Sequence, residues 1–166
     1  LAAGAVLTFL LLAGYVLLAA KRLRGRLDVP RRLLQGLAML VAAWCVYGLV
    51  FVSGANTKTA AVRTEYRSLH PLLRMAVSTL VLVDSGLLVT DAARTVDDYS
   101  AMGLPAYEAS LHRVQPDGHA HALDLRTTGR SGFRNGLLRV YFAGLGFRTL
   151  RHTGTADHLH VSLPLP

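Results

Sequence analysis

Two long apolar segments separated by a short basic loop constrain the fold of this chain more than any other feature. Residues 1–20 (LAAGAVLTFLLLAGYVLLAA) carry no charge, and residues 33–52 (LLQGLAMLVAAWCVYGLVFV) have Gln35 as their only strongly polar side chain. Each segment has about the 20 residues that a helix needs to cross a bilayer. Both exceed the roughly 7–15 apolar residues of a cleaved signal peptide. We therefore predict a transmembrane helical hairpin over 1–53; the alternative is a buried hairpin in a soluble fold.

The loop at 21–32 (KRLRGRLDVPRR) predicts the orientation of this hairpin. It holds six of the 18 Lys and Arg residues of the chain. Short loops rich in Lys and Arg stay on the cytoplasmic side of a membrane, and such loops also contact anionic lipid. The rest of the chain, 54–166, is therefore predicted to lie outside the cytoplasmic membrane, on the periplasmic or cell-wall side. No aromatic platform or recognition helix accompanies the basic residues, so we expect no nucleic-acid partner.

The outer segment, 54–166, is long enough for one small domain with its own core. It has 12 basic and nine acidic residues, so most of the formal charge of +8 comes from the loop. The single cysteine, Cys45, lies in the second apolar segment. A disulfide within the chain and a CxxC metal motif are therefore both excluded.

The order of patterns in 54–166 predicts an α+β domain with a small antiparallel sheet flanked by helices. Apolar residues recur at helical spacing through 60–84, and Pro71 is expected to open the second half of that helix. A short strand at 87–90 and a short helix ending at Gly103 are expected next, followed by a hairpin at 110–126 around a QPDG turn. A further helix is expected to begin at Ser131, with an apolar stripe formed by Phe133, Leu137, Val140 and Tyr141. Two strands around HTGTAD end the domain.

Two segments, SLHRVQPDGHAHALDLR (110–126) and DHLHV (157–161), concentrate the side chains that can do chemistry. In a strand, His158 and His160 project from the same face. Imidazole and carboxylate groups are good ligands for first-row metals, and three of them with a water form the usual catalytic zinc site. The sequence has no Gly-x-Ser-x-Gly elbow and no phosphate-binding glycine loop. These patterns favour metal-assisted chemistry.

The order ARTVDDY, SLH…ALDL, a helix ending in LGF, then DHLHV resembles the zinc D-Ala-D-Ala carboxypeptidase and L,D-endopeptidase group, the LAS-type peptidases. The resemblance covers roughly residues 70–163. It implies that Zn²⁺ is held by His112 of SLH, Asp124 of ALD and His160 of HLH. Zinc would activate a water and polarise the scissile carbonyl of a peptide.

The same resemblance implies roles for four further residues. Asp157 stands where the family places its general base, and His158 occupies an alternative His-x-His position. Arg94 matches the arginine that steadies the substrate, and Ser110 begins the motif that contacts it. From the residues alone, Arg94 could equally be a surface arginine paired with Asp97 or Asp98, and Asp157 could be a turn residue.

The spacing within 110–126 departs from the family pattern, Ser-x-His-x-x-Gly-x-Ala-x-Asp. Eleven residues lie between His112 and Asp124, where the pattern has six. One explanation is a turn lengthened by five residues at VQPDG, and the other is that His119 or His121 supplies the ligand. A regular strand opposes the second explanation, because Asp124 then shares a face with neither of these histidines.

We therefore expect a membrane-anchored, multi-pass zinc peptidase that hydrolyses peptide bonds in peptidoglycan stem peptides. Its partners would be the peptidoglycan peptide and the lipid bilayer, with a membrane partner protein as a further candidate. Two alternatives stay open. The outer domain could bind a cell-wall peptide or a partner protein without cutting it, or it could be the docking part of a structural membrane assembly subunit.

Overall fold

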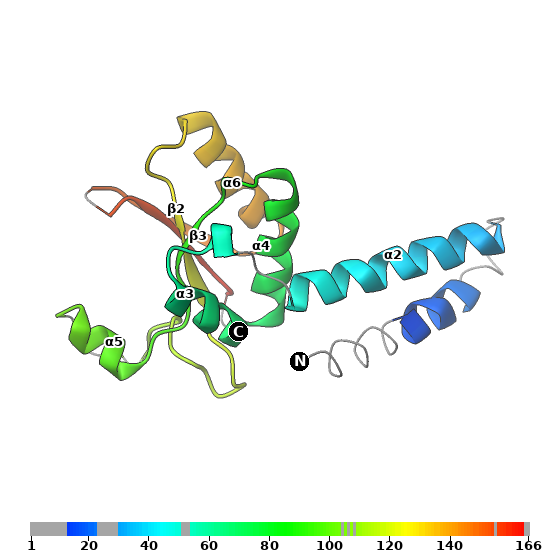
Figure 1. Cartoon of the computed structure of the whole chain (residues 1–166), viewed down its shortest axis with the longest axis horizontal. Coiled ribbons are helices and arrows are strands. Elements are labelled where there is room, and N and C mark those ends of the chain that lie inside the picture. Colours follow the sequence, from blue (N-terminus) through cyan, green and yellow to red (C-terminus); the bar gives the residue numbers. More distant parts are fainter. Residues whose placement is uncertain are drawn as a thin grey trace. The chain divides into compact units, whose positions relative to one another are not determined.

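The computed structural model describes residues 13–22, 30–50, 54–103, 105, 107, 109–154 and 156–164. The chain divides into two compact units, Leu1–Phe51 and Val52–Pro166, which are described separately (Figure 1). The second unit contains a four-stranded antiparallel sheet together with helices. The predicted α+β class is therefore confirmed.

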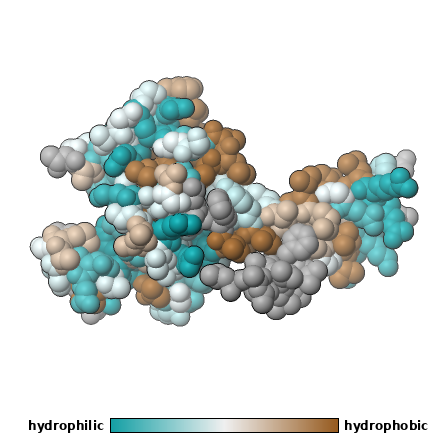
Figure 2. Space-filling view, viewed as in Figure 1, coloured by the Kyte–Doolittle hydropathy of each residue, from teal (hydrophilic) through white to brown (hydrophobic). Residues whose placement is uncertain are grey.

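The N-terminal unit contains a helix at 13–22 and the longer helix α2 (Arg31–Val50). Among the described residues, α2 alone is long and apolar enough to cross a membrane, and only 17% of its apolar stretch is buried. Its exposed side chains include Leu33, Leu40 and Trp44, and Figure 2 shows apolar side chains along its surface. The predicted span 33–52 thus corresponds to α2. The predicted span 1–20 is helical from residue 13, and residues 1–12 lie outside the described part.

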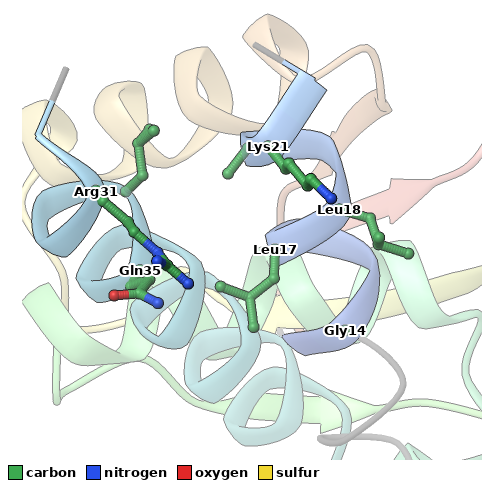
Figure 3. A pocket seen from close by; sticks show the side chains of 8 residues that line it. Gly14, Leu17, Leu18, Lys21, Arg31 and Gln35 are labelled. Atoms are coloured by element: carbon green, nitrogen blue, oxygen red, sulfur yellow. The ribbon is translucent and has the colours of Figure 1, made fainter. Parts of the chain in front are cut away.

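A pocket of about 610 Å³ lies between the helix at 13–22 and the start of α2. Leu17 and Leu18 line it from the first helix, and Arg31 and Gln35 line it from α2 (Figure 3). Lys21 also contributes to the lining. Residues 23–29 of the predicted basic loop lie outside the described residues, but its two described ends place Lys21 and Arg31 beside the same pocket.

The helical segment predicted over 60–84 is interrupted by a bend. It consists of α3 (Ala60–Glu65), the 3-10 turn η2 (Tyr66–Ser68) and α4 (Pro71–Val83). His70 has extended backbone angles because the residue before a proline is disfavoured in the helical region. Pro71 then occupies the first turn of α4, as predicted, and His70 Nδ1 accepts a hydrogen bond from Leu72 N. This bend fixes the position of His70 at the start of α4.

The sheet consists of β1 (Val89–Asp91), β2 (Ala122–Arg126), β4 (His158–Ser162) and β3 (Arg148–His152), in that spatial order and all antiparallel. Alternation along the strands gives the sheet two unlike faces. On β2 and β4 one face is fully buried and apolar, and its side chains are Leu123, Leu125, Leu159 and Val161. The opposite face carries Asp124, His158 and His160. The polar side chains that could act in a site therefore lie on the second face.

The buried face packs against α4 and α6 (Gly132–Gly144). Leu73 and Val77 of α4 and Leu138 and Phe142 of α6 belong to one core. The two helices are also joined by a hydrogen bond of 2.8 Å from Tyr141 Oη to the carbonyl of Ala76. The remaining elements are the 3-10 turn η1 (Gly54–Asn56) and the short helix α5 (Val96–Ala101), which ends just before Gly103 as predicted.

Two sequence predictions are wrong in detail. The predicted α6 stripe is largely exposed, at 76% for Phe133 and 69% for Val140, because the buried face is centred on Leu138 and Phe142 instead. The predicted hairpin at 110–126 has its QPDG turn, across which Gln115 N donates to the His119 carbonyl, but only its second half forms a strand of the sheet. Both edges of β2 are occupied by β1 and β4, so 110–114 cannot pair alongside β2, and a single bridge joins Val114 to Ala120.

Candidate metal centre

Three elements bring His112, Asp124 and His160 together on the polar face of the sheet. Asp124 on β2 and His160 on β4 are direct register partners, so their side chains leave the sheet side by side. His112 comes from the loop after α5, where its carbonyl accepts a hydrogen bond of 2.8 Å from Arg94 N. His121 N donates to the neighbouring Leu111 carbonyl at 2.7 Å. These backbone bonds hold the loop, and with it His112, above Asp124.

The ligand atoms of the three residues converge on one point. His112 Nε2 lies 3.2 Å from His160 Nδ1 and 3.4 Å from Asp124 Oδ1. His160 Nδ1 lies 2.9 Å from the same carboxylate oxygen. His112 and Asp124 are buried, and His160 is half-buried. The group is therefore shielded on the protein side and accessible through His160.

The hydrogen bond on the far side of His112 fixes which nitrogen faces this point. His112 Nδ1 lies 2.7 Å from the carbonyl oxygen of Ala92, so Nδ1 carries the proton and donates it. The lone pair of Nε2 then faces the Asp124 carboxylate and the His160 ring. A backbone carbonyl behind a histidine is the usual support of a metal-ligating imidazole. Two imidazoles and a carboxylate whose ligand atoms lie this close together could hold a metal ion.

The charge state of Asp124 suits a metal ligand. Burial alone raises the pKa of this carboxyl, but the adjacent His112 and His160 side chains outweigh burial and hold the pKa well below its usual range. Asp124 therefore stays ionised at neutral pH. The chemistry of the donor set is that of two imidazoles and one carboxylate.

Arg94 lies beside this group. Its Nε donates to Asp91 Oδ2 at 2.7 Å, its NH2 group also contacts Asp91, and NH2 lies 3.4 Å from Asp124 Oδ2. The guanidinium carbon is 5.6 Å from the ring centre of Tyr99. Arg94 thus pairs with Asp91 at the end of β1, not with Asp97 or Asp98. Asp91 was not singled out from the sequence, although it directly follows the predicted strand at 87–90.

A cleft of about 760 Å³ opens over the polar face of the sheet. Asp91, Arg94, Asp124, Asp157 and His158 are among the residues that line it. His158 Nε2 lies 3.6 Å from Asp124 Oδ2, while its Nδ1 bonds to the carbonyl of Ala156. The volume is in the range of small-ligand sites. The cleft therefore brings together four of the residues singled out from the sequence.

Asp157 lines the cleft, but its carboxylate already has partners. Arg151 donates to both of its oxygens, at 3.1 and 2.8 Å, and Thr127 Oγ1 donates to Oδ1 at 2.5 Å. The Arg151 guanidinium and then the Thr127 hydroxyl lower the pKa of Asp157 to about 2. In this arrangement Asp157 fastens the turn between β3 and β4 and is a poor proton acceptor at neutral pH.

The remaining predicted residues fall into two places. Ser110 accepts a hydrogen bond of 2.5 Å from Tyr99 Oη, close to His112. His119 and His121 lie next to His70 rather than in the Asp124 group. His152, which sequence patterns did not indicate, stacks on His158 with ring centres 4.8 Å apart. Its position opposite His158 in the β3–β4 register was the signal that could have found it.

We compared the chain with models of protein families, with curated proteins and with solved structures, and none of them matches. The function is therefore inferred from the geometry of the centre and from the sequence motifs.

Proposed function

We propose that the protein is a membrane-anchored zinc peptidase that hydrolyses peptide bonds in peptidoglycan stem peptides. The observation that carries this proposal is the convergence of His112, Asp124 and His160, together with an open cleft that Asp124 lines. The motif order that resembles the LAS-type peptidases places the same three residues as zinc ligands. Geometry and resemblance thus support one ligand set.

The donor set favours zinc over the harder cations. Two imidazoles and one carboxylate suit Zn²⁺, whereas Mg²⁺ and Ca²⁺ prefer ligand shells made of oxygen. Three protein ligands leave a coordination position open, as catalytic zinc sites do. Zinc would supply an activated water and polarise the carbonyl of the substrate.

The protein residues around the centre supply binding and proton transfer. Arg94 reaches the cleft with part of its guanidinium, and it is suited to stabilise negative charge that develops on the scissile carbonyl oxygen. The acyl–nitrogen bond breaks as water adds its oxygen to the acyl carbon. One proton of that water passes through a side chain to the departing amine, so the products are a carboxylate and an amine.

The proton carrier is His158 or Asp157, and the contacts favour His158. Its Nδ1 is engaged by the Ala156 carbonyl, so Nε2 carries a lone pair and faces Asp124. Asp157 is held by Arg151 and Thr127. A general base works best when its pKa lies near the working pH, and a pKa of about 2 is far below that range.

The first test is zinc content together with muropeptide digestion by the purified full-length chain in detergent. We expect bound zinc, cleavage of stem peptides, loss of cleavage after treatment with a chelator, and recovery when Zn²⁺ is added back. Mass spectrometry of the products measures all of these. If the protein prepared without chelator holds no zinc and cleaves no muropeptide, the proposal fails.

The N-terminal unit supports a location in the cytoplasmic membrane with the sheet domain outside. Helix α2 has the length, hydropathy and exposure of a membrane span, and Lys21 and Arg31 flank the loop that the orientation rule places inside. The two-span hairpin over 1–53 is part of this proposal, as is contact of the loop with anionic lipid.

Reporter fusions test this topology. A reporter enzyme that needs disulfides is active only outside the cytoplasm. We expect it to be active after Pro166 and inactive after Arg26 in the loop, as measured in whole cells. Activity after Arg26 with none after Pro166 would reverse the orientation.

A domain that binds cell-wall peptide without cutting it is the second candidate. The ion pairs of Asp157 with Arg151 and of Arg94 with Asp91 favour it, because both groups are engaged within the protein. Peptide binding with bound zinc but without turnover would support this candidate over the peptidase.

A further inference from the structure

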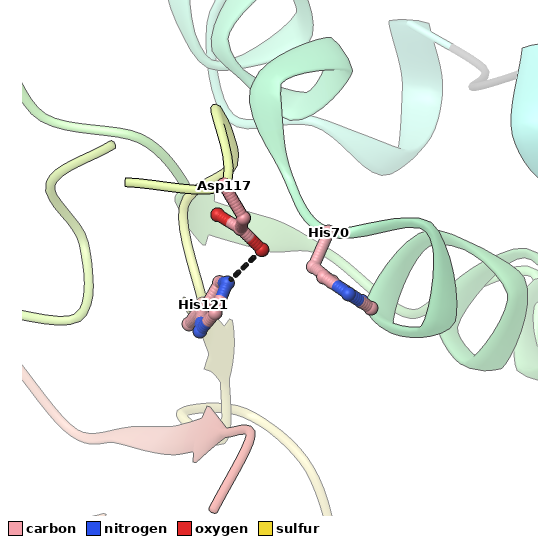
Figure 4. A group of neighbouring side chains, drawn as sticks. All are labelled: His70, Asp117 and His121. Carbon is pink, nitrogen blue, oxygen red and sulfur yellow. Dashed lines mark hydrogen bonds and ion pairs between the residues drawn. The ribbon is translucent and has the colours of Figure 1, made fainter. Parts of the chain in front are cut away.

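A second group of side chains that could hold a metal ion lies at the turn that separates His112 from Asp124. His121 Nε2 lies 2.8 Å from Asp117 Oδ2, and the His70 ring stands edge-on to the His121 ring with centres 5.2 Å apart. Figure 4 shows His70 at the start of α4 beside the Asp117–His121 pair. The group shares no residue with the candidate metal centre. It includes a histidine, His121, that the sequence offered as an alternative ligand there.

Backbone hydrogen bonds hold this group in place. His70 N donates to the Ala120 carbonyl at 2.9 Å, and Ala120 N donates to the Ser68 carbonyl at 2.8 Å. Within the turn, Gly118 N donates to the Gln115 carbonyl at 2.9 Å. Gly118 has φ +83°, which favours glycine. The turn that carries Asp117 and His121 is therefore fixed against His70 before any ligand arrives.

Two buried ring nitrogens among the described residues of this region lack a hydrogen-bond partner. Among the described residues, Nδ1 of His121 and Nδ1 of the neighbouring His119 are buried and have no hydrogen-bond partner. Buried polar atoms without a partner are uncommon and call for an explanation such as an ion. The ligand atoms of His70, Asp117 and His121 all lie within 4.8 Å of one another. Ligands of one tetrahedral zinc are about 3.3 Å apart, so the three side chains would have to close by up to about 1.5 Å to hold one ion.

We infer that His70, Asp117 and His121 bind a second divalent cation of the zinc class, which fastens the lengthened turn to the start of α4. Two imidazoles and a carboxylate select first-row metals such as Zn²⁺ over Mg²⁺ or Ca²⁺. Metal binding by His70 breaks the hydrogen bond that His70 Nδ1 accepts from Leu72 N, and this hydrogen bond is long at 3.3 Å. Asp117 is exposed, so water completes the coordination from the solvent side. This site is structural and does not depend on the proposed peptidase activity.

Zinc stoichiometry of the full-length chain tests the inference. The metal-free protein is dialysed against micromolar Zn²⁺, and bound zinc is measured by elemental mass spectrometry. We expect two ions per chain for the wild type and one for the Asp117→Asn/His121→Gln variant. Asp124→Asn is also expected to bind one, and its melting temperature should still rise with Zn²⁺. His152→Gln, an exposed histidine outside both groups, should bind two.

A measurement on the wild type alone guards against misfolding of the variants. Zn²⁺ should protect His70 and His121 from modification by diethyl pyrocarbonate, read by peptide mass spectrometry, while His152 stays reactive. Unprotected His70 and His121 at saturating zinc would overturn the inference. So would two ions bound to the Asp117→Asn/His121→Gln variant, or a single ion on the wild type that Asp124→Asn removes. Because the two sites respond to different substitutions, failure here leaves the proposed peptidase standing.

Discussion

Replacing Asp124 by asparagine is expected to remove the ion of the candidate metal centre and to lower the rate of peptide hydrolysis by more than about 100-fold. Substitution of residues that merely support metal ligands already lowers metal affinity or activity by about 10–100-fold. Asp124 contributes the charged ligand oxygen itself. The carboxylate lies at the centre of the group, within 3.6 Å of three imidazoles. Asparagine keeps the volume and removes the charge, so packing on β2 should survive.

The measurements are zinc content by elemental mass spectrometry and initial rates of muropeptide cleavage. Asp97→Asn is the matched control, because Asp97 is an exposed carboxylate on α5 and its substitution should change neither. Unfolding followed by circular dichroism checks that Asp124→Asn remains folded. Full zinc content at this centre, with cleavage unchanged, would show that the ligand set is wrong.

The placement of Asp124, His158 and His160 on one face of the sheet follows from strand alternation. DHLHV alternates polar and apolar side chains, so His158 and His160 had to share a face. ALDL likewise puts Asp124 opposite two core leucines, Leu123 and Leu125. Local pattern was sufficient because both strands lie in a sheet with one buried face.

Other parts of the fold depend on contacts between distant residues, which local pattern does not specify. The first half of the hairpin at 110–126 is not a strand of the sheet because β1 and β4 occupy both edges of β2, and this depends on strand order rather than on the turn. The buried face of α6 was misplaced because Asn135 is buried, with its side chain donating to the Thr127 carbonyl. His70 and His121 are 51 positions apart and meet only through the bridge between Leu69 and Ala120.

His158→Gln is expected to lower kcat by about 10²–10⁴-fold, the usual contribution of a general acid–base group, while zinc content stays unchanged. Glutamine places an amide near the position of Nε2 and so keeps a polar group beside Asp124, but an amide does not accept the proton of water. Asp157→Asn is expected to cost less, since the carboxylate bound by Arg151 has a pKa of about 2 and holds its proton poorly.

The comparison of these two variants assigns the base. Rates of muropeptide cleavage and zinc content are measured for both, with His152→Gln as the control for loss of the ring that stacks on His158. A larger loss in Asp157→Asn than in His158→Gln would assign the base to Asp157 instead. That outcome would require the Arg151–Asp157 pair to open when substrate binds, because a carboxylate held by a guanidinium at 2.8 Å cannot take up a proton readily. Arg151→Gln separates the two cases: freeing Asp157 should raise its pKa and the rate if Asp157 is the base, and should leave the rate nearly unchanged if His158 is.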